Sequence, residues 1–348
     1  MAISPGSLRP DFSPAVNQVR TAVRRFLVDH EVADTIAVAC SGGADSLALA
    51  AATGHCAAAL GLAVHGLVVD HQLQPCSAQV AQTTGGQLRQ LGYPVVQVLP
   101  VTVNAAAGSG GLEAAARRAR YQALRDAAPG GALVLLGHTL DDQAETVLLG
   151  LGRGSGPRSV AGMRELDPPW GRPLLRVRRA VTAAACAALN LDPWTDPHNA
   201  DPRFRRVRLR TEVLPLLEDV LAGGVAQALA RTAGQLREDL DVLDGQAGEL
   251  LLAVLRDPST DVVPNAQTGS NAQPDAGELD VAALIPHPAA LRRRVLRRWL
   301  LNAGVTELTD AHLRAADDLI GHWSGQGAVR LPGAFELARG RGRLHVSR

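Results

Sequence analysis

The first 150 residues alternate between short apolar runs rich in β-branched residues and longer alanine-rich stretches. The apolar runs predict strands at 35–40, 63–69, 94–101 and 132–136. The alanine-rich stretches predict helices at 46–60, 77–91, 112–128 and about 140–151. Strands that alternate with helices are typical of a parallel sheet with helices on both faces. Right-handed crossovers then predict an open, doubly wound α/β sheet.

The rest of the chain has a different character. Residues 151–222 are irregular, with glycine, proline and arginine clusters, and they end in a predicted helix around 208–220. Further helical patterns and a final pair of short strands are expected at 224–255, 289–302, 309–322 and 328–346. Residues 257–275 are rich in Pro, Ser, Asn and Gln, which predicts a disordered insert. The sequence therefore predicts an α/β domain over 1–222 and a smaller, mainly helical domain over 223–348.

Bulk composition narrows the class of protein. Of the 348 residues, 46% are hydrophobic and 20% are charged, which is typical of a soluble globular protein. The net charge of +1 gives no overall basic field, so any RNA-binding surface must be a local patch. All 35 basic residues are arginine, so phosphate contacts must come from guanidinium groups, backbone N–H groups or metal.

Two further features argue against other classes. The four cysteines lie far apart and form no C-x-x-C pair, which disfavours a zinc ribbon, an iron–sulfur site or a disulfide framework. Residues 46–69 contain no charged side chain and are long enough to span a bilayer. Glycines interrupt this run, however, and it divides into a helix and a strand, so we interpret it as part of the buried sheet. With no signal-peptide pattern at the N-terminus, we expect a cytoplasmic protein without a membrane partner.

The turn after the first predicted strand has the composition of a phosphate-binding loop. It consists of six residues, Ser41, Gly42, Gly43, Ala44, Asp45 and Ser46. The glycines let the backbone approach an anion, the helix start offers free N–H groups, and the serines add hydroxyl donors. Asp45 is unexpected beside an anion, and its carboxylate suggests a bound Mg²⁺ that bridges the phosphates. The alternative is an ordinary strand–turn–helix in which Ser46 or Asp45 caps the helix.

This loop differs from two common nucleotide-binding motifs. The chain has no G-x-x-x-x-G-K-[ST] sequence, and no G-x-G-x-x-G follows a predicted strand. Polar residues follow three of the strands: Ser41, Asp70 with His71, and His138. Because ligands in open α/β sheets bind beyond the carboxyl ends of the strands, we expect these positions to converge on one crevice.

A second group of ionisable residues follows the fourth predicted strand. His138, Asp142 and Glu145 are spaced by four and three, so on a helix they share one face. We interpret them as ligand-binding groups that lie opposite the phosphate loop. The alternative is a well-capped helix, with Thr139 as its cap and a solvated acidic first turn that the helix dipole favours.

Both groups carry a resemblance to known families. The loop at 41–46 resembles the SGGxDS signature of the ATP-pyrophosphatase (PP-loop) superfamily, whose members cleave ATP between the α and β phosphates and transfer AMP to an oxygen. The run at 138–146, HTLDDQAET, followed by RGSG and Met163, is similar to the pattern HhxDDQxET…RGSG…GM of the tRNA(Ile)-lysidine synthetases. Further similar segments are Val69–Leu73, Leu112–Tyr121, Arg172–Leu175 and Asn199–Pro215. The resemblance thus covers roughly 33–220.

Some positions depart from the family pattern. Val207 stands where the family usually has Asn, Phe204 where it often has Tyr, and 72–74 lack the usual Arg. These departures put the base or phosphate contacts of those positions in doubt, but leave the adenylation chemistry unaffected.

The resemblance implies a fold, a reaction and a set of roles. The fold is that of the adenine nucleotide hydrolases, with ATP and Mg²⁺ as cofactors. The reaction joins free L-lysine to the first anticodon cytidine of a tRNA(Ile) with a CAU anticodon, through a base that ATP has adenylated. The implied roles are pyrophosphate binding by 41–46, Mg²⁺ binding by Asp45, adenine contact near Asp70, lysine binding by Asp142 and Glu145, base or α-phosphate contact by His138, and α-phosphate or cytosine contact by Arg117 and Arg206.

Other interpretations remain open from the sequence. The arginines at 292–298, with Arg203, Arg205, Arg208 and Arg210, would suit a tRNA backbone path, although such arginines are often merely solvated. A PP-loop thiolase, a PP-loop amidating ligase and a non-catalytic RNA-binding homologue are the rival functions. Dispersed cysteines argue against the first, the lack of a glutaminase-like segment against the second, and the intact loop against the third.

Overall fold

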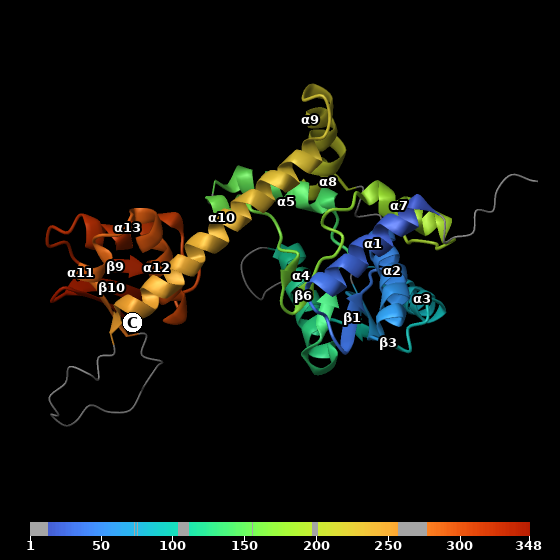
Figure 1. Ribbon diagram of the computed structural model, residues 1–348, viewed down its shortest axis with the longest axis horizontal. Helices are drawn as coiled ribbons and strands as arrows, with labels where there is room; N and C mark the ends of the chain where they lie inside the picture. Colours follow the sequence, from blue (N-terminus) through green and yellow to red (C-terminus); the bar gives the residue numbers. More distant parts are fainter. Residues whose placement is uncertain are drawn as a thin grey trace, which may run out of the picture. The chain divides into compact units, whose positions relative to one another are not determined.

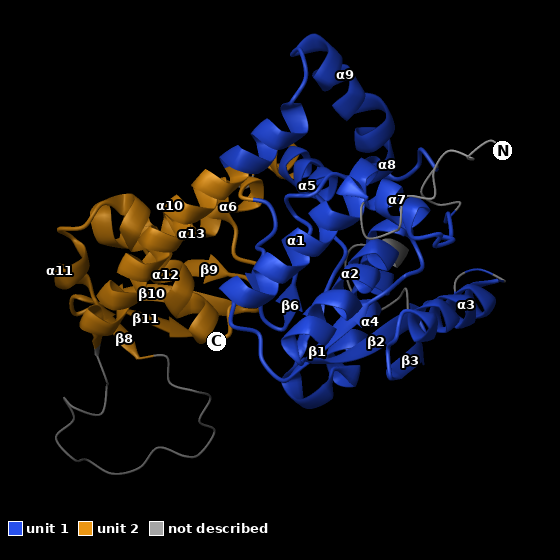
Figure 2. Ribbon diagram, turned by 45° about the vertical axis from the view of Figure 1, so that its right-hand side comes forward, with its two compact units in different colours: residues 1–149, 162–232 blue, residues 150–161, 233–348 orange. Residues whose placement is uncertain are grey.

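The chain divides into two compact units. The structure is a computed structural model and describes residues 13–72, 74, 76–103, 111–154, 156–196, 201–256 and 277–348. Unit 1 comprises 1–149 and 162–232, and unit 2 comprises 150–161 and 233–348 (Figure 2). Two helices, α5 (Leu140–Arg153) and α10 (Val225–Val254), contribute residues to both units.

Unit 1 is built on a six-stranded sheet in the order β3-β2-β1-β4-β6-β5. Figure 1 labels β1, β3 and β6 of this sheet. Its strands are β1 (Thr35–Ala39), β2 (Ala63–Asp70), β3 (Val95–Pro100), β4 (Leu133–Leu135), β5 (Leu166–Asp167) and β6 (Trp170–Gly171). All neighbouring strands pair in parallel except β5, which is antiparallel to β6 at the edge. The four predicted strands and their parallel pairing are therefore confirmed, whereas the two-residue strands β5 and β6 were not predicted.

Helices cover both faces of this sheet, as the alternating pattern predicted. They are α1 (Pro14–Asp29), α2 (Ala44–Leu60), α3 (Ser77–Gln90), α4 (Gly111–Ala127) and α7 (Arg179–Ala188). Ile36 and Val38 of β1 belong to one buried cluster with side chains of α1, α2, α3 and α7. Ala37 between them belongs to the opposite cluster, which includes Leu124 of α4 and Trp170 of β6. Successive side chains of β1 therefore pack into two hydrophobic cores on opposite faces of the sheet. Helices α1 and α7 were not predicted.

A helical segment closes unit 1 beside α5. It consists of α8 (Arg205–Arg208), a π-helical turn η4 (Leu209–Val213) and α9 (Leu214–Val220), and it matches the helix predicted at 208–220. Leu214 and Ala226 pack against Leu140 and Ala144 of α5 in a small buried cluster. This packing holds Arg210 next to the acidic first turns of α5.

Unit 2 combines helices with a five-stranded antiparallel sheet in the order β7-β8-β11-β10-β9. Besides its part of α10, it contains α6 (Pro157–Val160), β7 (Leu255–Arg256), β8 (Glu278–Asp280), α11 (Val281–Leu284), α12 (Ala289–Asn302), α13 (Asp310–Gly321), β9 (Val329–Leu331), β10 (Phe335–Gly340) and β11 (Arg343–Ser347). The last three strands lie at the predicted 328–346 segment, and the described part of the unit has more helix than strand, as predicted. The insert predicted at 257–275 lies outside the described residues.

The uncharged run at 46–69 forms most of α2 and β2, as interpreted from the sequence. Within the described residues, no single helix is long and apolar enough to cross a membrane. One bent pair, 205–220 with 225–254, passes on length and composition alone and is broken by an angle of 94°.

Candidate active site

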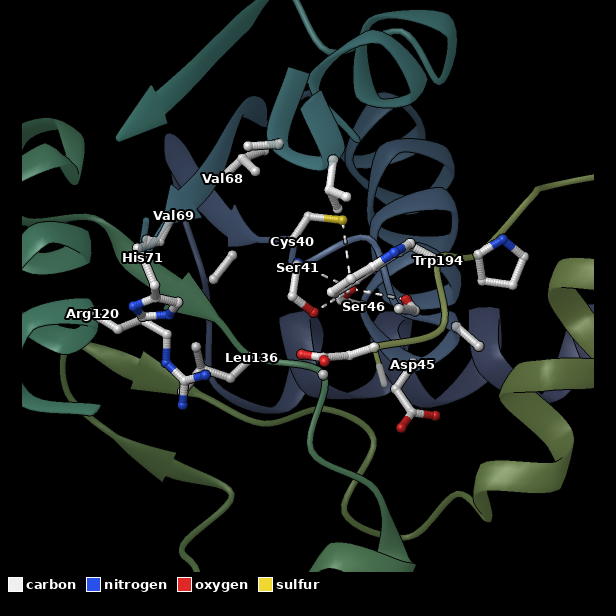
Figure 3. A pocket seen from close by; sticks show the side chains of 18 of the residues that line it. Cys40, Ser41, Asp45, Ser46, Val68, Val69, His71, Arg120, Leu136 and Trp194 are labelled. Carbon is white, nitrogen blue, oxygen red and sulfur yellow. Dashed lines mark hydrogen bonds between the residues drawn. The ribbon is translucent and has the colours of Figure 1, made fainter. Parts of the chain in front are cut away.

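Residues of unit 1 enclose a cavity of about 620 Å³ at the carboxyl ends of β1, β2 and β4 (Figure 3). Ser41 and Ser46 line it from the end of β1, Asp70 and His71 from the end of β2, and His138 from the end of β4. The polar positions that follow the three strands therefore converge on one cavity, as the fold rule predicted.

The turn that follows β1 is held together around the Ser46 hydroxyl, which is buried. Its Oγ donates to the carbonyl oxygen of Gly43 at 2.9 Å and accepts from the backbone N–H of Ser41 at 3.2 Å. The Oγ atoms of Ser41 and Ser46 lie 3.3 Å apart (Figure 3). Gly43 is the N-cap of α2, and as a glycine it has no side chain that could accept from the first N–H groups of that helix. Those N–H groups are therefore available to an anion.

Two glycines shape the turn. Gly42 has a φ of +85°, and a Cβ built on it would lie 2.5 Å from Oγ1 of Thr84 on α3. A Cβ on Gly137, which follows β4, would lie 3.0 Å from both N and Cα of Ser46. The first glycine thus permits the left-handed backbone, and the second lets the end of β4 approach the start of α2.

A short loop before 197 lies against the same turn. The backbone N–H of Trp194 donates to the carbonyl oxygen of Gly42 at 3.0 Å, and Trp194 lines the cavity (Figure 3). This aromatic ring supplies an apolar wall beside the polar turn.

One arginine joins three carboxylates at the edge of the cavity. Arg179, the first residue of α7, places Nη2 2.6 Å from Asp142, Nε 3.3 Å from Asp45 and Nη1 3.3 Å from Glu145. Arg210 adds a second contact to Glu145, with Nε 2.9 Å from Oε1. The Thr182 hydroxyl also donates to Asp45.

The charges of this cluster follow from burial and pairing. Burial raises the pKa of Asp45, although the Thr182 hydroxyl and the Arg179 guanidinium oppose the shift. Burial would also raise the pKa of Asp142, but Arg179 and the backbone N–H of Thr139 outweigh it and hold the pKa below its usual range. Burial would lower the pKa of Arg179, whereas the surrounding carboxylates raise it above its ordinary value. At neutral pH, Asp142 and Arg179 are therefore a charged pair.

His138 is neutral in this structure. Burial lowers its pKa to about 3, against the opposing effect of Asp142 and with the help of nearby arginines. Its Nδ1 atom is buried and has no hydrogen-bond partner among the described residues, and the same holds for Nδ1 of His71. A neutral imidazole with so low a pKa suits hydrogen bonding to a ligand better than proton removal from an ammonium group.

Comparison with known proteins identifies the family. The sequence model of the PP-loop domain matches residues 16–217, and that of the TilS substrate binding domain matches 279–345. The chain is 56% identical over 338 residues to the tRNA(Ile)-lysidine synthase of Rhodococcus jostii, with 96% of each chain covered. It is 54% identical over 320 residues to that of Mycobacterium tuberculosis, with 92% of this chain and 91% of the relative covered. The chain belongs to the tRNA(Ile)-lysidine synthase family.

Membership in the lysidine synthases confirms the resemblance of the sequence motifs and makes the chain an ATP-dependent ligase with a PP-loop ATP-binding domain. A solved structure agrees on the fold alone. A U34-tRNA thiolase from Methanococcus maripaludis superposes with a TM-score of 0.52 at 15% identity, covering 64% of this chain and 80% of the thiolase.

The structure places most, but not all, of the predicted site residues on the large cavity. Ser41, Gly43, Ala44, Asp45, Ser46, Asp70, His138 and Asp142 line it. Glu145 is fully buried and instead lines a neighbouring cavity of about 130 Å³ with Asp141, Arg178, Arg179 and Arg210. Gly42, Arg117 and Arg206 line neither cavity.

The two predicted arginines lie near the cavity rather than on its wall. Arg117 is exposed and donates from Nη2 to the Tyr121 hydroxyl at 3.1 Å. Arg206 is close enough to Arg120 for its charge to help lower the pKa of that arginine, although burial is the main cause. Arg120 itself lines the cavity beside His71 (Figure 3).

Sequence reasoning missed two residues that the structure brings to the site. Arg179 and Thr182 come from α7, which was not predicted. The one available signal was the pair Arg178–Arg179 a few residues after the Arg172–Leu175 motif. Arg210, assigned to tRNA contact from the sequence, instead pairs with Glu145.

Several arginines of the predicted tRNA path have carboxylate partners. Within unit 1, Arg203 pairs with Asp201 and Arg208 with Glu212. Within unit 2, the ion pairs are Arg292–Asp317 and Arg294–Asp244. These contacts reduce the positive charge that each group offers to a phosphate backbone.

The described residues offer limited coordination for a metal. They contain no group of three or more His, Cys, Asp or Glu side chains that could hold an ion. Magnesium commonly takes one or two protein carboxylates and fills its other positions with phosphate oxygens and water. Asp45, which is partly exposed in the turn after β1, has a carboxylate that fits such a site beside a nucleotide.

Proposed function

We propose that the chain carries out the reaction for which its relatives are named, as a cytoplasmic enzyme. It would join L-lysine to the first anticodon cytidine of a tRNA(Ile) with a CAU anticodon, through an adenylated base, and release AMP and pyrophosphate. The observation that carries this proposal is the convergence of the phosphate-binding turn and the Asp142 carboxylate on one cavity. One half of such a site suits a nucleotide, and the other suits an incoming amine.

The nucleotide half consists of 41–46 and the end of β2. The N–H groups at the start of α2 and the hydroxyl groups of Ser41 and Ser46 would hold the leaving pyrophosphate. Asp45 would hold Mg²⁺, which compensates phosphate charge. Asp70 is buried and its Oδ1 accepts from the N–H of Gln72 at 3.0 Å, so it orders the loop where we place the adenine ring.

The amine half consists of the acidic first turns of α5. Asp142 and Glu145 would attract the cationic lysine, whose ε-amine must lose a proton before it can attack. Proton removal by Asp142 would require that Arg179 no longer hold the pKa of that carboxyl low. Neutral His138, with an unpartnered Nδ1, would hydrogen-bond the base or the α-phosphate. Arg117 and Arg206 would contact the cytidine or the phosphate that enters beside Tyr121.

The tRNA body would bind to both units. The substrate-binding match at 279–345 supports a role for unit 2 in this contact. We retain Arg293, Arg297 and Arg298 of α12 as phosphate contacts. Arg292 and Arg294 are excluded because their guanidinium groups pair with Asp317 and Asp244.

The test uses the full chain with ATP, Mg²⁺, labelled L-lysine and a tRNA transcript that carries a CAU anticodon. Mass spectrometry of the anticodon nucleoside should show lysine joined to cytidine, with one pyrophosphate released per product. Asp45→Asn should lose this product and remain folded, whereas Asp167→Asn, at an exposed carboxylate on β5, should keep it. Product formation by Asp45→Asn would contradict the metal role, and turnover with ammonia or a sulfur donor in place of lysine would favour a rival PP-loop reaction.

A further inference from the structure

Arg179 lies where the two cavities of unit 1 meet. It lines the large cavity together with the phosphate-binding turn, and it lines the small cavity together with Glu145 and Asp141. Its side chain is 25% exposed, whereas that of Glu145 is 0% exposed. The guanidinium group therefore separates the nucleotide half of the site from the buried carboxylate of the amine half.

The same guanidinium group neutralises both halves at once. Each of its three nitrogens faces a different carboxylate: Nε faces Asp45 on α2, Nη2 faces Asp142 on α5, and Nη1 faces Glu145 one turn later. A backbone contact also fixes the start of α7, because Asp141 accepts from the N–H of Arg179 at 2.8 Å. In this arrangement Arg179 occupies the positions where a cation on Asp45 and a cationic amine on Asp142 would each have to bind.

We propose that Arg179 is a positioning residue that couples nucleotide binding to lysine binding. In the free enzyme its charge blocks the carboxylates of the amine half. The phosphates of bound ATP offer the guanidinium group a stronger anionic partner on the same cavity wall, and Mg²⁺ replaces it at Asp45. Once Arg179 pairs with phosphate, Asp142 can receive the lysine ammonium, while Glu145 keeps its ion pair with Arg210. This inference rests on the proposed function, because it takes lysine and ATP as the two ligands.

Coupling of this kind is reciprocal. If nucleotide raises the affinity for lysine by some factor, lysine must raise the affinity for nucleotide by the same factor. Coupling between two sites commonly amounts to about 5- to 150-fold, and we expect about tenfold here. It also favours lysine entry after ATP, so that the amine meets a loaded site.

The experiment measures lysine binding without chemistry. Labelled L-lysine is dialysed against the full chain and the CAU tRNA transcript, with or without Mg²⁺ and α,β-methylene-ATP, which cannot be cleaved between the α and β phosphates. Wild type should bind lysine about tenfold more tightly with the nucleotide analogue. Arg179→Gln should bind lysine equally in both states, because Asp142 has lost its close ion pair with Arg179 even without nucleotide.

Two further variants separate coupling from structural damage. Arg178→Gln removes the neighbouring arginine, which pairs with Asp141 instead, and should keep the wild-type ratio. Arg179→Lys keeps the positive charge and should restore part of the ratio that Arg179→Gln loses. General damage to the fold weakens binding in both states and leaves the ratio unchanged.

The ratio compared here is the affinity for lysine with the nucleotide analogue divided by the affinity without it. Three results would overturn the inference: a ratio of one for wild type, a ratio for Arg179→Gln equal to that of wild type, or no lysine binding by wild type in either state. Product formation by wild type in the mass-spectrometric assay decides whether the proposed function stands. If the lysine-modified cytidine forms while the ratio is one, only the coupling role of Arg179 falls.

Discussion

Replacing Gly42 with alanine tests the physical account of the phosphate-binding turn. At a φ of +85°, an L-residue costs about 1–2 kcal/mol relative to glycine. The new Cβ would also lie 2.5 Å from Oγ1 of Thr84, too close for any real contact. That hydroxyl donates to the carbonyl oxygen of Val80 at 2.9 Å, and moving it away sacrifices a hydrogen bond worth about 1 kcal/mol. We expect Gly42→Ala to lower the free energy of unfolding by about 2–3 kcal/mol in total.

Gly61→Ala is the matched control for the cost of the left-handed backbone. Gly61 ends α2 with a φ of +70°, and nothing lies within 4 Å of its built Cβ. This variant should lower the free energy of unfolding only by the cost of placing an L-residue in the left-handed region, about 1–2 kcal/mol. In a Thr84→Ala background the contact is absent, so the cost of Gly42→Ala should fall to that of Gly61→Ala.

Calorimetry can measure these differences. The unfolding transition that ATP shifts upward belongs to the nucleotide-binding unit, because a ligand stabilises only the state that binds it. In a domain of about 200 residues, 1 kcal/mol corresponds to about 2–4 °C in Tm, so Gly42→Ala should lower it by about 5–10 °C. If Gly42→Ala lowers Tm by the same amount with and without Thr84→Ala, the contact with Thr84 does not affect stability and the reasoning is wrong.

Two further predictions concern the cavity wall. Gly137→Ala should weaken binding of an ATP analogue by about tenfold or more, because the new Cβ would lie 3.0 Å from the backbone of Ser46 and neither segment can move without cost. Gly86→Ala, which has open space around its Cβ, is the control, and both variants are compared with wild type by titration calorimetry. If Gly137→Ala binds the analogue as tightly as Gly86→Ala, the prediction is wrong. His138 has a folded pKa of about 3, below the unfolded value near 6.5, so its stabilising effect is present above pH 6.5 and is lost as the pH falls toward 3. Between pH 7.5 and 5.0, wild type should therefore lose about 2 kcal/mol more stability than His138→Gln, and equal losses would show that the imidazole is not buried as described.

The parts of the fold that the sequence revealed are those in which one residue type repeats with a clear period. The buried parallel strands are continuous apolar runs, and glycine pairs or polar residues mark where each of them ends. Because the carboxyl ends of parallel strands meet at one edge, placing Ser41, Asp70 and His138 together required only that the strands be parallel. The six-residue loop was readable for the same reason, since its function depends on local backbone geometry.

Other elements lacked a local signal. The strands β5 and β6 have two residues each and exist only because β4 offers an edge to pair with. Helix α7 follows an irregular, arginine-rich stretch, and its contacts with α1 and α2 decide its place. Tertiary packing of this kind overrides local propensity and leaves no period to read.

The carboxylates of the site illustrate why a charge pattern alone could not complete it. Asp45 and Asp142 are far apart in the sequence, and each on its own is compatible with a solvated helix start. The fold brings them to one cavity, where Glu145 is completely buried, and buried carboxylates require a cation within reach. The chain has no lysine, so an arginine must supply that charge, and α7 delivers Arg179 to it. A guanidinium group can face three carboxylates at once, which an ammonium group on a flexible stem does poorly. The same geometry makes the pairing exchangeable under the proposed function, because ATP would bring phosphate for Arg179 and lysine would bring an ammonium group for Asp142.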